Sequence, residues 1–307
     1  MTFEQMLDKG KAMTATEAGL LHLDFDQVAQ LVDAHNLSEA EEHRYWCALI
    51  EHWLSQLGDQ LKGHVRFFET DNFFLLSARE AQETELISNF VETCYKKTQI
   101  SLKGIVDGQP IGKQVVICMG DPDQYYRYVS KYYPDDGEFA GSAGVFLKCE
   151  YGHIVIAPGD YDNCEFTLAH ELTHALVSHL SLPRWLDEAI AVSNEHSLLG
   201  LKPIYGDSKL KTDAVEYWQK NGLQEFWTGE AFFDPVAGNH SYLLAELLLT
   251  KIMGTSPHKA VAFVNQAEFE DGGEEACQTA FGHSLGVFAG SVLGAGDWNP
   301  QLEDGTP

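Results

Sequence analysis

A short stretch of the chain, HELTH, carries residue types that can hold a metal ion and move a proton. Its histidines, His170 and His174, are four positions apart, so on a helix they lie on one face, one turn apart, and can reach one ion. Glu171 is turned by about 100° from His170 and would border the ion without binding it. This H-E-x-x-H pattern indicates zinc chemistry, with Glu171 as general base.

A third ligand is required, because a catalytic zinc site usually has three protein ligands and keeps one position for water. Glu188 is the candidate, 14 positions after His174. Pro183 lies between them and predicts the start of a second helix, which can fold back against the first. Two histidines and a glutamate are a known catalytic zinc set. The sequence therefore predicts zinc held by His170, His174 and Glu188.

Two alternatives stay open for this motif. In a chain with 13 histidines, HELTH could be a chance match on an amphipathic helix. Zinc could also be a structural staple in a binding or regulatory protein, although structural sites are usually closed by four ligands, often cysteines. Only three ligands are identified, and Glu171 is available beside them. This favours an open site and catalysis.

The motif and the segment after it, PRWLDEAIA, resemble the gluzincin zinc metallopeptidases. The likeness is closest to the peptidase-MA-like family, in which HExxH is followed by W-L-x-E-G-x-A. It covers residues 64–293 and is strongest over 168–191, and Ala189 departs from the family's glycine. The resemblance implies an α+β fold: a thermolysin-like catalytic domain with a small mixed sheet and a helical subdomain. The residues before it are expected to form an N-terminal helical segment.

The resemblance also implies an activity, the hydrolysis of peptide bonds in a peptide or protein substrate. In gluzincins a tyrosine or histidine of the helical half stabilises the oxyanion, and Tyr242 matches by position, with His240 as second choice. A tyrosine near a helix start is also a common packing feature. Because zinc ligands fix the metal chemistry and not the acyl group, a zinc hydrolase with a non-peptide substrate stays open as well.

The edge strand of the family's sheet pairs with the backbone of the substrate. By resemblance this role falls on Gly141–Phe146, which precedes the zinc helix in a predicted hairpin. The alternative is an ordinary hairpin whose glycines serve only the turn geometry.

The remaining sequence predicts the elements that position the motif. Residues 1–62 are expected to be helical, with Ser38 and Glu41 forming a capping box before a helix at 39–61. Strands are predicted within 64–77, at 114–119, and as a hairpin at 144–149 and 153–157. Further helices are predicted at 78–97, within 122–133, at 209–220, at 240–253 closed by Gly254, and from Ala280.

These elements suggest four segments. They are an N-terminal helical segment at 1–62, a sheet-containing part with the zinc helix at 63–200, a helical subdomain at 201–293 and a loose tail at 294–307. In the first segment, His43 and His52 are expected to pack or face solvent and not to bind metal. Whether this segment docks a partner or only packs is left open by the sequence.

Charge limits the possible partners. Asp and Glu total 46 against 20 Lys and Arg, a formal net charge of −26, which disfavours nucleic acid and anionic membranes. Such acidity could also be a general feature of the proteins of the source organism. With no apolar run of about 18 residues and no apolar signal-peptide core, we expect a cytoplasmic protein. The six scattered cysteines, without C-x-x-C, predict reduced and mostly buried thiols.

Overall fold

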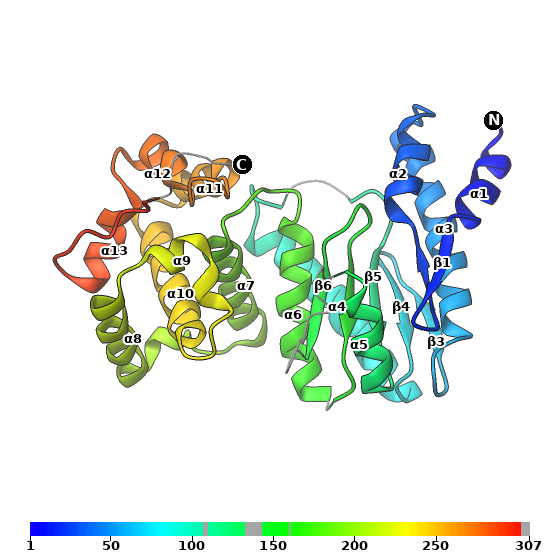
Figure 1. Cartoon of the computed structure of the whole chain (residues 1–307), viewed down its shortest axis with the longest axis horizontal. Helices are drawn as coiled ribbons and strands as arrows, with labels where there is room; N and C mark the ends of the chain where they lie inside the picture. The colour runs from blue at the N-terminus through cyan, green and yellow to red at the C-terminus, as the bar shows by residue number, and fades with distance from the viewer. Residues whose placement is uncertain (107–109, 133–142, 160, 302–307) are drawn as a thin grey trace. The chain divides into compact units, whose positions relative to one another are not determined.

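The computed structural model describes residues 1–106, 110–132, 143–159 and 161–301. The chain forms two compact units, one of Met1–Lys97 with Gly108–Ala175 and one of Thr98–Asp107 with Leu176–Pro307. In the described residues, all strands belong to the first unit, and the second consists of helices and their connections (Figure 1). The expected combination of helices with small sheets is confirmed.

A five-stranded mixed sheet organises the first unit. The strands β4, β5 and β7 are parallel, and β3 and β6 pair antiparallel at the two edges. The parallel strands are almost entirely apolar and buried, as expected where both faces of a sheet are covered. The bounds are β3 (Arg66–Glu69), β4 (Phe73–Ser77), β5 (Gln114–Cys118), β6 (Gly144–Leu147) and β7 (His153–Ile156), in the order β3-β4-β5-β7-β6.

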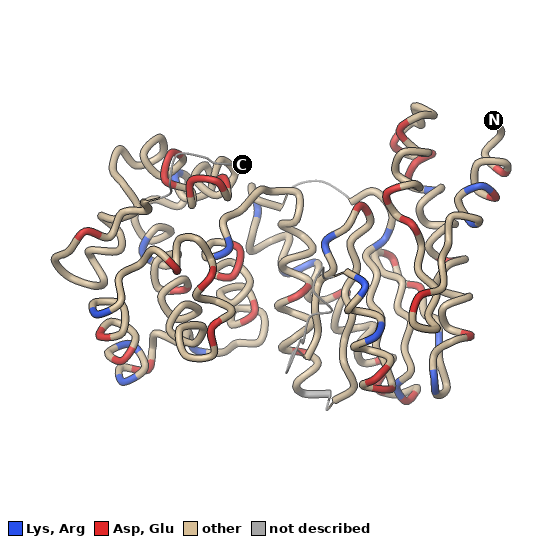
Figure 2. Tube along the Cα trace, in the orientation of Figure 1, with Lys and Arg blue, Asp and Glu red and all other residues tan. Residues whose placement is uncertain are grey.

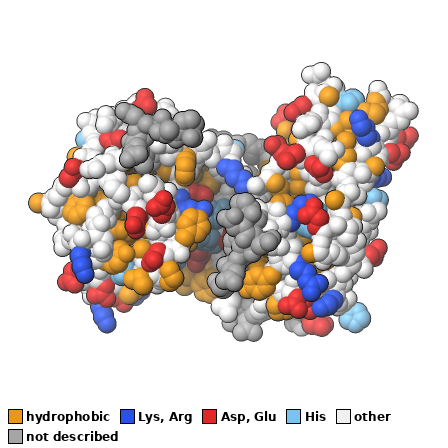
Figure 3. All heavy atoms as spheres, in the orientation of Figure 1, with side chains coloured by type: hydrophobic (Ala, Val, Ile, Leu, Met, Phe, Trp, Pro, Cys, Tyr) orange, Lys and Arg blue, Asp and Glu red, His pale blue; other side chains and the backbone are white. Residues whose placement is uncertain are grey.

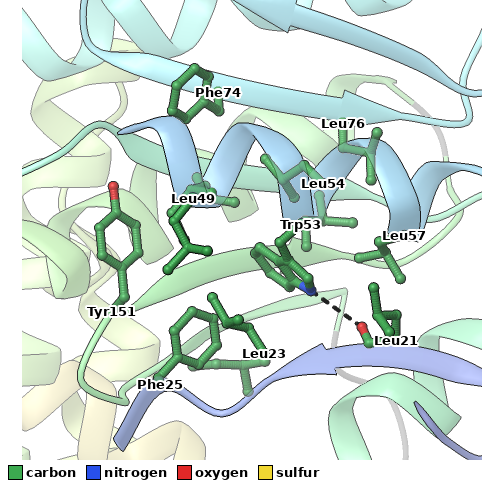
Figure 4. Close-up of a cluster of buried hydrophobic side chains, with 14 of the residues drawn as sticks. Leu21, Leu23, Phe25, Leu49, Trp53, Leu54, Leu57, Phe74, Leu76 and Tyr151 are labelled. Carbon is green, nitrogen blue, oxygen red and sulfur yellow. Dashed lines mark hydrogen bonds between the residues drawn. The ribbon is translucent and has the colours of Figure 1, made fainter. Parts of the chain in front are cut away.

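The N-terminal elements cover one face of this sheet. Helix α3 contributes Trp53 and Leu54 to a buried cluster that also contains Phe74 and Leu76 of β4 (Figure 4). Trp53 donates from Nε1 to the carbonyl of Leu21 at 3.3 Å. The elements that contribute to this cluster are α1 (Phe3–Lys11), β2 (Leu20–Leu23), α2 (Phe25–Asp33), α3 (Glu39–Gly58) and α5 (Pro122–Ser130).

Residues 14–23 differ from the predicted helix. They form a hairpin of β1 (Thr14–Glu17) and β2, in which Glu17 pairs with Leu20. The turn residues Ala18 and Gly19 both have positive φ, 50° and 81°, as a two-residue type I′ turn requires. All of β2 is buried, so packing of this apolar run outweighed the local helical preference. The capping box of Ser38 and Glu41 is confirmed.

The other face of the sheet carries α4 (Ala81–Ser101) and α6 (Tyr161–Val177). Phe73 packs edge-on against Tyr95 of α4, with ring centroids 5.7 Å apart. The Cys164 thiol of α6 and burial raise the pKa of the Cys118 thiol of β5 well above its usual value, so the two side chains lie close together. As predicted, all six cysteines are free thiols, and four of them are buried. These contacts fix α6 against the sheet.

The second unit packs its helices around aromatic side chains. Trp185 of α7 lies against Phe226, Trp227 and Phe263, and its Nε1 donates to the carbonyl of Gly272 at 2.9 Å. The helices are α7 (Arg184–Leu199), η1 (Ile204–Gly206), α8 (Ser208–Asn221), α9 (Gln224–Thr228), η2 (Glu230–Phe232), α10 (Ala237–Thr255), α11 (Pro257–Gln266), α12 (Glu274–Phe281) and α13 (Leu285–Leu293).

Two helix ends in this unit differ from the prediction. Gly254 does not close its helix, because α10 continues to Thr255 and is followed by Pro257, and a proline ends a helix more strongly than a glycine does. Ala280 lies near the end of α12, and the next helix begins at Leu285. Within the predicted loose tail, Trp298 is buried.

Charged residues occur on elements of both units (Figure 2). On the face drawn in Figure 3, acidic, basic and apolar side chains are interspersed. No helix in the described part of the chain combines the length and the apolar character that a membrane span requires.

Candidate metal centre

Helix α6 presents both histidines of the HELTH motif on one side. Leu168 and Leu172 are buried on its other side, so the packing of the helix fixes its rotation. The Nε2 atoms of His170 and His174 lie 3.1 Å apart. Their rings are inclined at 75° with centroids 4.7 Å apart. Both imidazoles therefore direct a ring nitrogen to the same point.

Glu188 joins this pair from the first part of α7. Pro183 occupies the N-cap position with extended backbone, as predicted from its place in the sequence. The Glu188 side chain is buried, whereas the two histidines are half-buried. His170, His174 and Glu188 each offer one ligand atom, and these atoms all lie within 4.8 Å of one another. The three predicted ligands are thus brought together and can hold a metal ion.

The donor set suits zinc. In a tetrahedral site with Zn–N bonds of 2.0–2.1 Å, two imidazole nitrogens lie roughly 3.3 Å apart. The observed separation of 3.1 Å between the Nε2 atoms is close to this value. Two imidazoles and one carboxylate are nitrogen and oxygen donors that zinc accepts, and a set of three is typical of catalytic sites.

Arg184 lies beside the third ligand. It is one helical turn before Glu188, and its Nη1 donates to Glu188 Oε1 at 3.2 Å. Its guanidinium also lies over the ring of Phe233, 4.4 Å from the centroid. A hydrogen bond of this kind to a ligating carboxylate orients it. The i, i+4 spacing could have signalled this pair in the sequence.

Glu171 is held by the backbone of the sheet edge. The N–H of Phe146 in β6 donates to Glu171 Oε2 at 2.7 Å. In an antiparallel pair, successive residues direct their N–H groups alternately toward and away from the partner strand. The carbonyl of Ala143 accepts a hydrogen bond from the N–H of Ala157 in this ladder. The backbone N–H of Val145 is therefore directed toward β7, and that of Phe146 is directed away from β7, toward α6. Sequence reasoning could not find this contact, because every non-proline residue carries the same backbone donor.

The predicted substrate-pairing segment is only partly within the described residues. Gly144 and Phe146 belong to β6, which lies at the edge of the sheet, whereas residues 141 and 142 lie outside the described chain. An added Cβ at Gly144 would meet Thr167 and Ile156 at 2.6 and 2.7 Å. This glycine is therefore needed for the close approach of β6 to α6.

The predicted oxyanion donors lie in α10, and the rings of both contact aromatic side chains. The ring of Tyr242 meets Phe232 edge-on, with centroids 5.3 Å apart. His240 stacks on Tyr217 at 4.5 Å, and its carbonyl accepts from Trp218 Nε1. A catalytic role for Tyr242 or His240 stays a prediction.

Comparison with known proteins gives no assignment. No protein-family model matches the chain, and no curated protein matches it. What can be concluded about function therefore comes from the residues of the metal centre.

Proposed function

We propose that this protein is a zinc-dependent hydrolase of peptide bonds with a thermolysin-like, gluzincin type of catalytic domain. The observation that supports the proposal is the convergence of His170, His174 and Glu188 within 4.8 Å, together with a base-type carboxylate, Glu171, on the same helix as the histidines. The motif segments at 168–191 resemble the peptidase-MA-like family, which supports the same reaction.

In this proposal His170, His174 and Glu188 hold the ion. When bound, zinc supplies Lewis-acid chemistry and lowers the pKa of a coordinated water to about 7. Glu171 accepts the proton of the attacking water and returns it to the leaving amine. The Phe146 N–H, 2.7 Å from Glu171 Oε2, keeps that carboxylate in one orientation during both transfers.

One further residue, Tyr242, and the edge of strand β6 complete the proposed reaction. Tyr242 donates to the oxyanion that develops at the scissile carbonyl, because a neutral donor stabilises charge that appears only in the transition state. The edge of β6 pairs with the backbone of the substrate. That pairing would bring the scissile bond to Glu171, since Phe146 of the same edge is bonded to this carboxylate.

The decisive variant is Glu171→Gln, which keeps the size of the side chain and removes its ability to accept a proton. We expect zinc content to stay unchanged while cleavage of a peptide library falls by about 100-fold or more, the usual contribution of a general base. Zinc is measured by elemental analysis and cleavage by mass spectrometry.

The matched control is Glu165→Gln, which removes a carboxylate from the same helix, α6. It should leave both zinc content and cleavage as in the wild type. Full cleavage by the Glu171 variant would refute the proposed base. Zinc bound at one ion per chain, with no peptide cleaved by the wild type, would favour a zinc-stabilised binding protein or a non-peptide substrate.

A further inference from the structure

The second unit contains a pocket on the side of α7 that faces away from Glu188. The pocket has a volume of about 290 Å³ and is lined by residues of α7, α10 and α11 and by the segment Ser101–Ile105. On α7 its lining residues include Ile190, Asn194 and Ser197, which lie roughly 120–180° around the helix from Glu188. The pocket is therefore separate from the metal centre.

Two asparagine side chains hold the segment after α4 that forms one wall of this pocket. Asn194 of α7 donates to Thr98 Oγ1 at 2.9 Å and accepts from Ser101 Oγ at 2.7 Å. Asn265 of α11 donates to the carbonyl of Gly104 at 2.6 Å. Gly104 has φ of +87°, a conformation that favours glycine. The segment after α4 is thus pinned to two helices, and the pocket is preformed.

The interior of the pocket is mostly apolar. Ile105, Ile190, Leu249, Met253 and Val264 line it, and Ile105, Ile190 and Val264 are buried. Small-molecule sites in proteins are concave, mainly apolar and supplied with a few polar groups that fix orientation. The size and lining of this pocket match a small ligand with an apolar body.

Two polar groups of the pocket, on Ser193 and Lys103, indicate that the other end of such a ligand is polar and anionic. Ser193 lines the pocket, and its Oγ is buried without a hydrogen-bond partner among the described residues. A buried hydroxyl without a hydrogen-bond partner is unfavourable, so a ligand that bonds to it would be stabilised. Lys103, exposed at the rim, is the single charged residue of the described lining. In a chain of net charge −26, a lining with one cation and no acid selects an anion.

We propose that this pocket binds a small amphipathic carboxylate, with its apolar body between α7, α10 and α11, its carboxylate at Lys103 and a hydrogen bond to Ser193. The ligand class follows from the lining: apolar surface for the chain, one hydroxyl and one cation for the anionic end. The proposal is independent of zinc and of catalysis.

The test is calorimetric titration of the full-length protein with n-alkanoates of increasing length, compared with n-alkanols and n-alkylamines of equal length. We expect the carboxylates to bind most tightly, with Kd falling about fourfold for each added methylene until the pocket is full. The amines should bind most weakly, because Lys103 repels them. No binding of any alkanoate, or equal binding of alkanoates and alkylamines, would overturn the proposal.

Variants locate the binding. Lys103→Glu changes an exposed residue and should weaken the binding of alkanoates by about three- to tenfold, with little effect on the binding of alkanols. The control Lys211→Glu on α8 makes the same change in charge and should not alter the affinity for any of these ligands. Thr250→Trp places a large side chain at an exposed position of the lining and should abolish binding of the whole series. Circular dichroism checks that each variant is folded. Wild-type alkanoate affinity in both Lys103→Glu and Thr250→Trp would show that the ligand binds elsewhere.

Discussion

Arg184 acts on a single atom of the metal centre, Glu188 Oε1, at 3.2 Å. Two effects of this arginine oppose each other. Its bond orients the carboxylate, while its positive charge repels a bound cation. The Arg184 side chain is 40% exposed, so solvent screens its charge, and the carboxylate it orients is only 8% exposed. Orientation should therefore outweigh repulsion.

Arg184→Ala should accordingly weaken zinc binding by about tenfold, within the range for residues that orient a metal ligand. Affinity is measured by competition with a chromophoric chelator. The matched control is Arg44→Ala, because Arg44 also lies over an exposed phenylalanine, Phe3, but has no part in the metal centre. Tighter zinc binding in the Arg184 variant would mean that repulsion is the larger effect.

Two buried histidines in the first unit resist protonation. His22 and His153 are almost fully buried, and His153 Nε2 lies 2.8 Å from the hydroxyl of Tyr128. Burial lowers the pKa of His22 to about 3, helped by the charge of Lys131. Burial likewise lowers the pKa of His153 to about 4. Both imidazoles are therefore neutral in the folded protein at neutral pH.

This makes stability depend on pH with a definite sign. Between about pH 4 and 6.5 the unfolded chain binds protons at these histidines and the folded chain does not, so stability falls as the pH falls. Each histidine contributes about 1.4 kcal/mol per pH unit in this window. The free energy of unfolding is measured with urea at pH 5 and 6. His153→Gln should reduce its change per pH unit by that amount, while the same substitution at the exposed His64 should not. Equal slopes in all three proteins would contradict the neutral buried state.

At the scale of elements, strand β6 connects the sheet to the proposed chemistry. Its Phe146 N–H faces α6 and donates to Glu171, whereas Val145 faces β7 in the ladder. The two neighbouring residues therefore use their backbone donors for different purposes. The N–H of Phe146 donates to the proposed base Glu171, and the N–H of Val145 takes part in the pairing of β6 with β7.

Proline substitutions separate these two purposes, because proline has no backbone N–H. Phe146→Pro should leave the sheet ladder intact, since an outward N–H on an edge strand is dispensable for pairing. It should lower peptide cleavage by about tenfold, through loss of one hydrogen bond to a charged group. Phe146→Ala keeps the donor and should retain most activity. Val145→Pro should lower the melting temperature more than Phe146→Pro does.

Cleavage rates and thermal melts of these three variants decide the matter. If Phe146→Ala and Phe146→Pro lose activity equally, the aromatic side chain and not the N–H is responsible. If Phe146→Pro melts as early as Val145→Pro, its backbone donor belongs to the ladder after all.

The elements of the metal centre could be predicted because their signals are local. The helical spacing of His170 and His174 and the break at Pro183 are contained in a few residues each. The β1–β2 hairpin could not, because its strand state depends on burying Leu20–Leu23 in a core assembled from distant segments. The end of α10 was misplaced because Gly254, although it weakens a helix, is tolerated inside one.

At the scale of the whole molecule, the α+β class followed from the resemblance of the motif segments to the gluzincins, and the excess of acids over bases is a property of composition. The division into units did not follow, because it is not sequential. Residues Thr98–Asp107 belong to the second unit, although the chain before and after them belongs to the first. No local pattern in these residues reveals which helices they will contact.

Because residues Thr98–Asp107 belong to the second unit, the protein cannot be separated into its two units by a single cut in the chain. A polypeptide that ends at residue 175 would still contain Ile105 and Val106, which are buried in the complete protein. It would lack α7, α10 and α11, whose side chains line the pocket around Ile105. A polypeptide that begins at Leu176 would lack the segment that Asn194 and Asn265 hold. We therefore expect the C-terminal half to be destabilised in isolation, and transplanting residues 98–107 onto it should restore its stability.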